Sequence, residues 1–561
     1  MKILLVAINA KYIHSNLAVY CLKSYAAKRG IEVELTEYTI NHRRDDILMD
    51  IYQRKPDVVA FSCYIWNLEF VQDIAADLYK VLPDLEIWGG GPEVSYDAEK
   101  FLAKHPEFRG IMKGEGERTF CELAGLYQIY GKEAVNKLDE CHGIVWRDPK
   151  GEISQGLPQA PISLDEVPFI YEEYENMMPF ENRILYYETS RGCPFSCSYC
   201  LSSIDKRVRL RSMELVEKEL QFFLDHKVPQ VKFVDRTFNA KKSHAMAIWK
   251  HILEHDNGVT NFHFEITADL LDEEELDLIS RMRPGLIQLE IGVQSTNPDT
   301  IKAIRRKMDL DRLRYVVERI NAGKNVHQHL DLIAGLPFED YDSFGRSFND
   351  VYSMEPEQFQ LGFLKVLKGS YMHEKVPDYD LQYRGKAPYE VLSTKWLPYS
   401  DVLRLKGVED MVEVYYNSRQ FMRTLKLFEQ EFDGAFAMYE YMAGYYDEQH
   451  LTGLNHSRLA RYEIFHDLIS RRAEQERMSM FEDALMCDLY LRENAKSRPS
   501  FALAQAPYKE EIRHMVPELR TLGTQVHAEV LRSGEVLLFD YREKDRLNHN
   551  AKVTVLGRTD V

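Results

Sequence analysis

Short apolar runs alternate with amphipathic helical stretches along the chain up to about residue 390. Two of the runs, KILLVAI at residues 2–8 and PDVVAFSCY at residues 56–64, are each followed by a helical pattern. A second series of about six strand–helix units starts at ILYYETS, residues 184–190. Repeated β-α units build parallel sheets covered by helices, and about six in a row fit a barrel or part of one. The pattern predicts the α/β class, with a doubly wound, Rossmann-like domain first.

Changes in hydrophobic periodicity and in proline content divide the chain into four segments. We expect an α/β domain over residues 1–140, a linker with a hairpin over 141–182, a barrel over 183–385 and a mostly helical domain over 386–561. Long helical periods mark the last segment, and two strand patterns end it. Prolines among acidic and aromatic residues, typical of a connector, mark the linker: Pro158, Pro161, Pro168 and Pro179.

Composition narrows the classes of partner and the cellular setting. The 561 residues carry a formal net charge of −18, which argues against nonspecific binding to nucleic acid or anionic membranes, because that needs basic surface. No apolar run reaches the ~18 residues of a transmembrane helix. The N-terminal run is interpreted as a buried strand, since no signal-cleavage pattern follows it. Eight cysteines, three of them within eight residues, do not form a disulfide framework. We expect a cytoplasmic protein without a membrane span.

Three cysteines stand together in SRGCPFSCSYC, residues 190–200, with the spacing C-x3-C-x2-C directly after an expected strand. One interpretation is a structural zinc site with a distant fourth ligand, although zinc loops usually combine two cysteine pairs or add histidines. The other is a four-iron cluster. Three thiolates on such a cluster leave one iron open to a small molecule that binds through amino and carboxylate groups. Barrels also place their chemistry just after strands.

The longer segment YYETSRGCPFSCSYC resembles the radical S-adenosylmethionine (SAM) superfamily, in which such a loop follows the first strand of a (βα)6 partial TIM barrel. The resemblance implies that Cys193, Cys197 and Cys200 ligate a [4Fe-4S] cluster. It also implies that Tyr199 packs on the adenine of SAM. Because the strand–loop context agrees with the family, we favour the cluster over zinc.

Four later segments follow the family pattern in order: VKFVDRTFN, FEIT, IGVQSTNPDTIKAIRRK and DLIAGLPFED. A strand-end acid taken alone is usually a solvated or capping group, so the prediction depends on order and spacing. The resemblance implies that Asp235 receives the methionine amino group of SAM. It places Gln294 and Ser295 near the ribose, and Arg306 near the carboxylate. The remaining SAM-binding candidates are Glu265, Ile333 and Gly335.

Three segments of the N-terminal part, SCYIWN, GGGPE and KGEGERTF, resemble the cobalamin-binding domain that precedes many such barrels. The resemblance covers residues 1 to about 130. It implies that Glu115 and Glu117 lie near the cofactor face toward the barrel. A nicotinamide site is disfavoured because G-x-G-x-x-G is missing, and the glycines could simply make a tight turn. The residues implied to line the nucleotide tail are Ser62, Cys63, Tyr64, Trp66, Gly89, Gly90, Gly91, Pro92 and Glu93.

His14 occupies the place of the lower cobalt ligand in the motif D-x-H-x-x-G, but the sequence there is Tyr12-Ile13-His14-Ser15-Asn16-Leu17. The Asp and the last Gly of the motif are absent. A ligating imidazole normally needs a second group to fix its tautomer, and a surface or capping histidine is the alternative. We predict that His14 does not bind cobalt.

The resemblance implies that the reduced cluster cleaves SAM to a 5′-deoxyadenosyl radical and that methylcobalamin donates a methyl group to an unactivated carbon or phosphorus. The alternatives are a cobalamin-dependent radical cyclisation or rearrangement, and a non-catalytic cobalamin or cluster sensor. We expect a small-molecule or peptide substrate and an electron donor such as flavodoxin or ferredoxin. Residues 389–420 resemble an uncharacterised domain. Neither the substrate nor a catalytic residue follows from the sequence.

Overall fold

The structure, a computed structural model, describes residues 1–174, 177, 180–517 and 519–561. Pro179 of the expected linker lies outside these residues. The chain divides into two compact units. Unit 1 comprises Met1–Leu278, Ile304–Lys307 and Leu364–Leu392. Unit 2 comprises Ile279–Ala303, Met308–Phe363 and Ser393–Val561.

Unit 1 begins with a seven-stranded sheet in the order β2-β1-β3-β4-β5-β6-β7. Strands β1 to β5 pair in parallel, and β6 and β7 continue the sheet antiparallel. The hairpin expected around Gly151 is present, and its two strands extend this sheet. The strands are β1 (Ile3–Asn9), β2 (Glu34–Thr39), β3 (Val58–Ser62), β4 (Glu86–Gly90), β5 (Gly110–Met112), β6 (Ile144–Arg147) and β7 (Ile153–Gln155).

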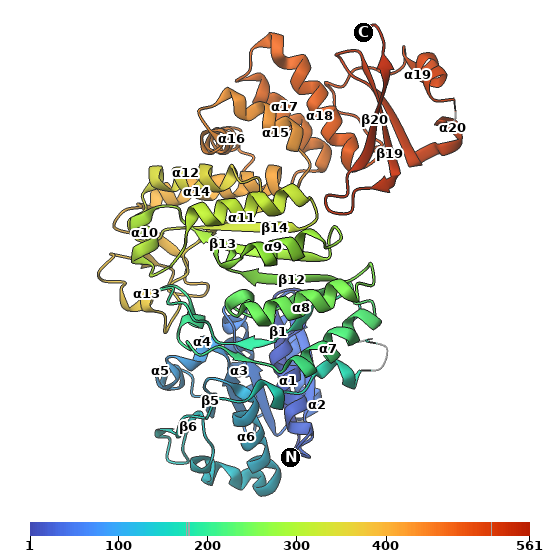
Figure 1. Cartoon of the computed structure of the whole chain (residues 1–561). Helices are drawn as coiled ribbons and strands as arrows, with labels where there is room; N and C mark the ends of the chain where they lie inside the picture. Colours follow the sequence, from blue (N-terminus) through green and yellow to red (C-terminus); the bar gives the residue numbers. More distant parts are fainter. Residues whose placement is uncertain (175–176, 178–179, 518) are drawn as a thin grey trace. The chain divides into compact units, whose positions relative to one another are not determined.

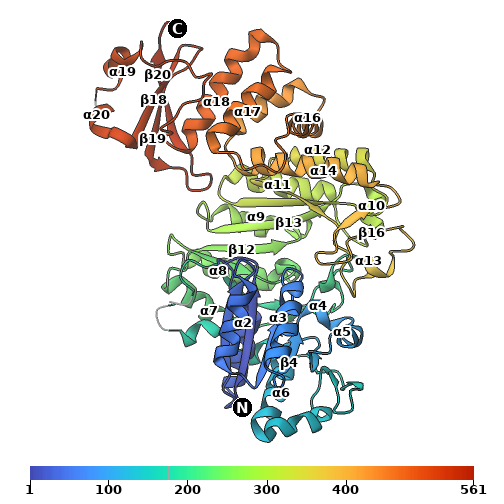
Figure 2. The ribbon, with the colours of Figure 1, turned by 180° about the vertical axis from the view of Figure 1, so that it is seen from behind.

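Helices cover both faces of this sheet, as predicted for a doubly wound domain (Figure 1). All residues of β1 are buried, which is typical of a parallel strand between two helical layers. Leu4 and Val6 pack with Ile47 of α2 and Val71 of α3, and α2 lies beside α3 (Figure 2). The alternate residues of β1 point to the opposite face. The helices are α1 (Leu17–Ala27), α2 (Arg44–Arg54), α3 (Leu68–Val81), α4 (Pro92–Ser95), α5 (Ala98–Lys104) and α6 (Gly116–Tyr130).

The second series of strand–helix repeats starts in unit 1. Strands β8 (Leu185–Tyr187), β11 (Gln230–Phe233) and β12 (Asn261–Ile266) pair in parallel in that order. A short antiparallel pair, β9 (Ser190–Arg191) and β10 (Arg209–Leu210), follows β8. The helices after the three strands are α7 (Met213–Asp225), α8 (Lys242–Glu254) and α9 (Glu273–Ser280).

Unit 2 holds the other three repeats. Strands β13 (Ile287–Gln294), β14 (His327–Ala334) and β15 (Gln358–Phe363) also pair in parallel. The helices among them are α10 (Pro298–Ala303), α11 (Leu310–Gly323) and α12 (Tyr341–Tyr352). Asp340 begins α12 by accepting a hydrogen bond from the Ser343 amide at 2.8 Å. The six expected strands are therefore present, and the polar residues of the motifs lie at or just after their ends. The return segment to unit 1 contains α13 (Tyr371–Glu374), β16 (Gln382–Tyr383) and β17 (Val391–Ser393).

The last part of unit 2 is mostly helical, as expected. Its final strand pair is also present, and β18 joins it as a third antiparallel strand. None of the helices that the structure describes is long and apolar enough to cross a membrane. The elements are α14 (Tyr399–Met411), α15 (Met422–Phe428), α16 (Ala435–Glu448), α17 (Arg458–Ser470), α18 (Met478–Arg492), α19 (Lys509–Met515), α20 (Leu519–Leu522), β18 (Val526–Val530), β19 (Glu535–Lys544) and β20 (Ala551–Arg558).

Candidate functional site

The cysteine loop starts and ends at the β9–β10 pair, which closes its base. Gly192 has a φ of +99°, and a Cβ there would lie 2.3 Å from the carbonyl oxygen of Arg207. Only glycine fits such a close backbone approach. The amide of Cys193 donates to the carbonyl of Asp205 at 2.9 Å. The loop therefore has a defined base directly after β8.

The three cysteines lie at different depths on this loop. Cys193 and Cys197 are buried, and Cys200 is half-buried. Among the described residues, no group of three or more His, Cys, Asp and Glu side chains converges as the ligands of a single metal ion would. A four-iron cluster instead bonds each thiolate to a different iron. Burial raises the pKa of the Cys197 thiol, and Arg306 acts in the opposite direction.

Arg306, the residue expected near the carboxylate of SAM, lies beside the cysteine loop. Its Nη1 is 3.8 Å from the Sγ of Cys197 and 3.5 Å from the hydroxyl oxygen of Tyr199. The amide of Ser198, between these two loop residues, donates to the carbonyl of Ile304 at 2.9 Å. A guanidinium held next to the cluster ligands can bind a carboxylate there.

Asp235 is fully buried, and both of its carboxylate oxygens accept hydrogen bonds from Thr189, from the amide at 3.0 Å and from the hydroxyl at 2.8 Å. The Nε2 of His244 in α8 lies 3.0 Å from the same hydroxyl. Burial raises the pKa of Asp235 to about 6 and lowers that of His244 to about 4. Thr189 immediately precedes β9, so this network holds the start of the cysteine loop. Sequence reasoning missed Thr189 and His244. The position of Thr189, a polar residue between β8 and the cysteines, was the one signal that could have pointed to this network.

The other SAM-binding candidates fall in both units. Glu265 is half-buried near the end of β12 in unit 1. In unit 2, Gln294 ends β13 with a φ of +72°, and its Nε2 lies 3.3 Å from an oxygen of Asp331. Its buried Oε1 has no hydrogen-bond partner among the described residues. Ile333 and Gly335 lie at the end of β14, where Gly335 has a φ of +85°.

Ser295 is completely buried in unit 2, and its hydroxyl donates to Glu339 at 2.7 Å. The hydroxyl of Ser347 donates to the same oxygen of Glu339 at 2.8 Å. Burial raises the pKa of Glu339 to about 7. Ser295 is therefore hydrogen-bonded inside the protein to Glu339. It directly follows Gln294, whose Oε1 has no partner among the described residues.

Two arginines at the base of the cysteine loop pair with acids of the N-terminal domain. Arg191 Nη2 is 2.9 Å from Glu117, and Arg209 pairs with Glu115. Glu115 also accepts the Ile162 amide at 3.0 Å. Burial by itself would raise the pKa of Glu115, but the hydrogen bond from Arg209 holds it below its usual value. Glu115 and Glu117 thus connect the N-terminal domain to the loop within unit 1.

The loops after β1 and β3 define the edge of the N-terminal sheet where its strand order reverses, and such edges bind ligands in doubly wound domains. Cys63 is fully buried, and Ser62 accepts a hydrogen bond from Asn16 at 3.2 Å. Tyr64 and Trp66 stack with ring centroids 4.5 Å apart. Trp66 remains exposed while its indole donates to a backbone carbonyl of β1 at 3.1 Å. This edge therefore presents a flat aromatic surface.

The three glycines at the end of β4, of which Gly89 and Gly90 are the strand's last residues, have different surroundings. Gly91 has a φ of +114°, and a Cβ there would lie 2.5 Å from the carbonyl oxygen of Cys63, so the turn itself requires glycine. A Cβ on Gly89 would meet Ile111 at 3.0 Å. A Cβ on Gly90 would make only ordinary contacts, the nearest at 3.5 Å. The protein's own packing therefore does not require glycine at Gly90.

Pro92 and Glu93 form the first turn of α4. Glu93 is buried and accepts a hydrogen bond from the Tyr389 hydroxyl at 2.9 Å. Tyr96, just beyond α4, lies close enough to Cys200 for that thiol's charge to raise the pKa of Tyr96, after the larger effect of burial. Sequence reasoning missed Tyr96, because nothing in the local pattern links α4 to the cysteine loop.

His14 lies in the loop after β1, and its Nδ1 is 2.7 Å from the Tyr186 hydroxyl oxygen of β8. Burial lowers the pKa of His14, and Lys11 and Lys232 lower it further. The missing Asp of the ligand motif is therefore matched by a hydroxyl from a distant strand. The statement that His14 does not bind cobalt stays a prediction.

The residues present fit the three implied groups. A cluster with an open iron suits the three thiols, and the buried hydroxyl of Ser198 beside them has no partner among the described residues. SAM suits Arg306, which lies beside Cys197 and Tyr199 within unit 1. Cobalamin suits the edge after β3 and β4, where Tyr64 and Trp66 stack and the turn at Gly91 requires glycine.

Three family models match the chain. The model described as B12 binding domain matches residues 3–124, the Radical SAM superfamily matches 187–351, and a protein of unknown function (DUF4080) matches 377–546. The chain thus contains a radical SAM domain, with a B12-binding domain before it and a domain of unknown function after it. The expected cofactors, a [4Fe-4S] cluster, SAM and cobalamin, are confirmed at the level of the domains that hold them.

Curated relatives share part of this arrangement. "Cobalamin-dependent radical SAM methyltransferase TokK" of Streptomyces tokunonensis is 27% identical over 60% of this chain and 51% of its own length. "Anaerobic magnesium-protoporphyrin IX monomethyl ester cyclase" of Rubrivivax gelatinosus is 22% identical over 56% of this chain and 57% of its own length. The chain spans about half the length of the curated relatives it matches first.

Among solved structures, "Cobalamin-dependent S-adenosylmethionine radical enzyme OxsB with aqua-cobalamin bound" resembles the chain with a TM-score of 0.61. The match covers 93% of this chain and 81% of that chain at 15% sequence identity. The likeness confirms the predicted fold class.

Proposed function

We propose that this protein is a cobalamin-dependent radical SAM methyltransferase that acts on an unactivated carbon or phosphorus. One observation carries the proposal. Within unit 1, Arg191 and Arg209 at the base of the cysteine loop pair with Glu117 and Glu115 of the domain that matches the B12 model. Ion pairs that join the cobalamin-binding domain to the cysteine loop suit a reaction in which cobalamin and the iron–sulfur cluster act on the same substrate. TokK, itself named a methyltransferase, favours the same reaction.

When bound, the three cofactors supply a carbon-centred radical and a transferable methyl group. Cys193, Cys197 and Cys200 ligate the cluster in this proposal. Arg306 orients the carboxylate of SAM, and Tyr199 covers its adenine.

The other residues take positioning or binding parts. Asp235 holds the start of the cysteine loop by accepting two hydrogen bonds from Thr189. The aromatic edge at Tyr64 and Trp66, with Gly90, receives the cobalamin tail.

The test is anaerobic turnover of the full chain reconstituted with iron, sulfide and hydroxocobalamin. A methyltransferase that also draws its methyl group from SAM releases both 5′-deoxyadenosine and S-adenosylhomocysteine. A cyclase releases 5′-deoxyadenosine alone, and a sensor leaves SAM intact. Absence of S-adenosylhomocysteine with every candidate substrate would overturn the proposal. The match to the R. gelatinosus cyclase makes cyclisation the second candidate.

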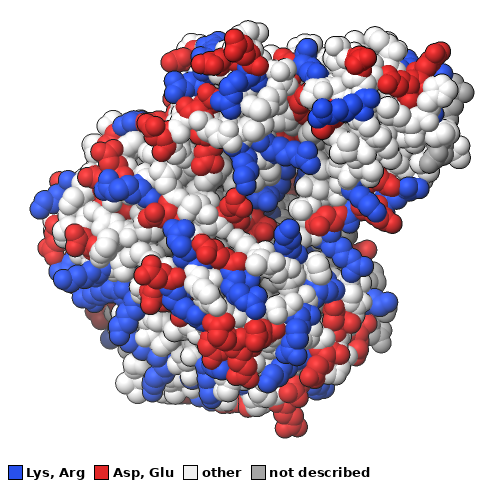
Figure 3. Space-filling model, turned by 45° about the horizontal axis from the view of Figure 1, so that its top comes forward, with Lys and Arg blue, Asp and Glu red and all other residues white. Residues whose placement is uncertain are grey.

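The substrate class is a small molecule or peptide, and the electron donor is a flavodoxin or ferredoxin. Acidic and basic side chains are interspersed on the face seen in Figure 3, and the formal net charge is −18. Such a surface does not favour nucleic acid. All eight cysteines are free thiols, which supports a reducing, cytoplasmic setting. Comparing metabolites of a deletion strain with those of its parent would identify the substrate.

A further inference from the structure

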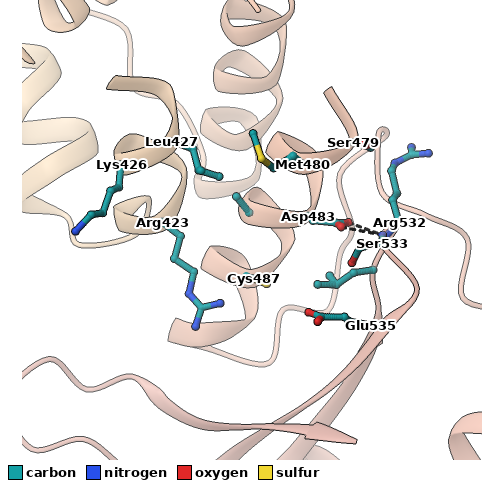
Figure 4. Close-up of a pocket in the computed structure, with 12 residues that line it drawn as sticks. Arg423, Lys426, Leu427, Ser479, Met480, Asp483, Cys487, Arg532, Ser533 and Glu535 are labelled. Atoms are coloured by element: carbon teal, nitrogen blue, oxygen red, sulfur yellow. Dashed lines mark hydrogen bonds between the residues drawn. The ribbon is translucent and has the colours of Figure 1, made fainter. Parts of the chain in front are cut away.

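The C-terminal domain contains a cavity that none of the cofactor candidates lines. Its volume is about 540 Å³, and helices α15 and α18 and the turn between β18 and β19 form its walls (Figure 4). Sites for small organic ligands usually measure about 300–1,000 Å³. All of its lining residues belong to unit 2, within the segment matched by the model of unknown function.

Two acids of α18 hold the walls of the cavity in place. Buried Asp488 accepts hydrogen bonds from the amides of Arg423 at 3.1 Å and Thr424 at 2.9 Å, at the start of α15. Asp483 accepts the amides of Arg532 at 2.6 Å and Ser533 at 2.9 Å, in the turn after β18. Both walls are therefore tied to one helix, so the cavity exists before any ligand enters.

The interior of the cavity is largely apolar. Ala484, Cys487 and Leu531 are buried, and Leu427 and Met480 complete the apolar part of the lining. Burial raises the pKa of the Cys487 thiol to about 12, so the thiol stays neutral. An apolar ligand body would gain free energy by leaving water for this lining.

Most charged groups around the cavity already have partners. Arg532 pairs with Glu482 and also donates to the carbonyl of Phe501 at 2.8 Å. Lys426 lies 3.3 Å from Glu355. The two acidic side chains that line the cavity also have partners. Asp483 accepts hydrogen bonds from the turn amides, and Glu535 pairs with Arg558.

Arg423 differs from the other cations of the cavity. Within the described part of the chain, no carboxylate lies at ion-pair distance from its guanidinium. Figure 4 shows this guanidinium at the cavity beside Cys487, and its charge lowers the pKa of that thiol in part. A planar guanidinium can bind an oxyanion through two parallel hydrogen bonds. One cation is thus available over an apolar cavity.

We propose that this cavity binds a small anionic amphiphile, an organic molecule with an apolar body and one acidic oxyanion group that Arg423 recognises. The proposal is independent of the methyl-transfer reaction. It assigns to the C-terminal domain a second ligand site, apart from the cofactor residues.

The test uses the full chain loaded with its cofactors and two fluorescent probes with the same ring system. One probe is 8-anilino-1-naphthalenesulfonate; the other, N-phenyl-1-naphthylamine, lacks the sulfonate. Arg423→Gln is expected to weaken binding of the sulfonate about tenfold, as the loss of a charge-assisted hydrogen bond implies. Binding of the neutral probe should change less than about twofold, because apolar burial is retained.

A second variant, Ala484→Trp, fills the cavity and should weaken both probes about tenfold, because their apolar bodies lose the space. If it does not fold, Met480→Trp at the rim replaces it. Arg513→Gln, on exposed α19, is the matched control and should leave both affinities unchanged. Equal sulfonate affinity in wild type and Arg423→Gln would overturn the proposal. Equal weakening of both probes by Arg423→Gln, or insensitivity to the filling variant, would also overturn it.

Discussion

Arginines border both the cysteine loop of unit 1 and the cavity of the C-terminal domain, but their partners differ. Arg191 and Arg209 pair with Glu117 and Glu115 at the loop base. At the cavity, buried Asp488 accepts backbone amides instead, and we propose that the Arg423 guanidinium binds a ligand. At the loop base the arginine charges form ion pairs that hold the structure together. At the cavity the proposed role of the arginine charge is to bind a ligand. The residue type alone therefore does not tell whether an arginine stabilises the fold or binds a ligand.

The largest expected effect separates the loop cysteines from the cavity cysteine. Replacing Cys193, Cys197 and Cys200 together by alanine should reduce the iron content from about four atoms per chain to none, because the ligands are lost. Cys487→Ala should keep the wild-type iron content. Iron and sulfide assays with visible absorption after anaerobic reconstitution measure both variants. Stoichiometric zinc without iron in the wild type would contradict the cluster assignment.

The next effect concerns the cobalamin edge. Gly90→Trp should abolish hydroxocobalamin binding, because the indole would occupy the space that the tail needs. Gly444→Trp, in a helix where a Cβ meets nothing within 4 Å, is the control and should bind normally. Retention of the cobalamin spectrum after gel filtration measures binding. Undiminished binding by folded Gly90→Trp would move the site away from β4.

Arg191 and Arg423 test the central contrast directly. Arg191→Gln should lower the free energy of unfolding by about 3 kcal/mol, because it leaves the buried carboxylate of Glu117 unpaired. Arg423→Gln should change it by less than about 0.5 kcal/mol, since it breaks no internal ion pair. Chemical denaturation of both variants measures the difference. Equal stability of the two would show that the loop-base pairs are not structural.

The pKa of Asp235, raised to about 6 in the folded state, predicts a pH dependence. Between about pH 4 and 6 the folded state holds a proton that the unfolded state has released. The unfolding free energy should therefore fall as pH rises through this range, by up to about 3 kcal/mol. Asp235→Asn should remove this slope. Asp488, whose pKa is raised to about 7, should retain its own slope in that variant. Urea unfolding at pH 4.5 and 7 compares them.

The smallest expected effect is at His14. His14→Ala should leave the paramagnetic resonance spectrum of bound cob(II)alamin unchanged, because we predict no cobalt–nitrogen bond. The Tyr186 hydroxyl, 2.7 Å from Nδ1, gives the imidazole a partner that the sequence motif did not reveal. Nitrogen superhyperfine splitting present in the wild type and lost in the variant would show that the prediction is wrong.

The α/β elements and the cysteine loop could be predicted from the residues alone, and the cofactor domains from the resemblance of their motifs to known families. Hydrophobic periodicity and cysteine spacing are local properties, so KILLVAI reads as a buried strand and C-x3-C-x2-C as one loop wherever the chain goes. The expected hairpin at Gly151 also follows from local turn chemistry. The local pattern did not reveal that the two strands of this hairpin, β6 and β7, join the N-terminal sheet.

The partners of charged groups were decided by tertiary structure. Arg209 meets Glu115 across 94 positions and Arg191 meets Glu117 across 74, so no local pattern predicts these pairs. Buried Asp235 accepts two hydrogen bonds from Thr189, 46 positions earlier in the chain, and no local pattern predicts this partner. Arg423 resembles any surface arginine in the sequence, and only the packing of α15 against α18 sets it over a cavity. Burial and pairing depend on distant segments, because electrostatic partners are chosen in space rather than along the chain.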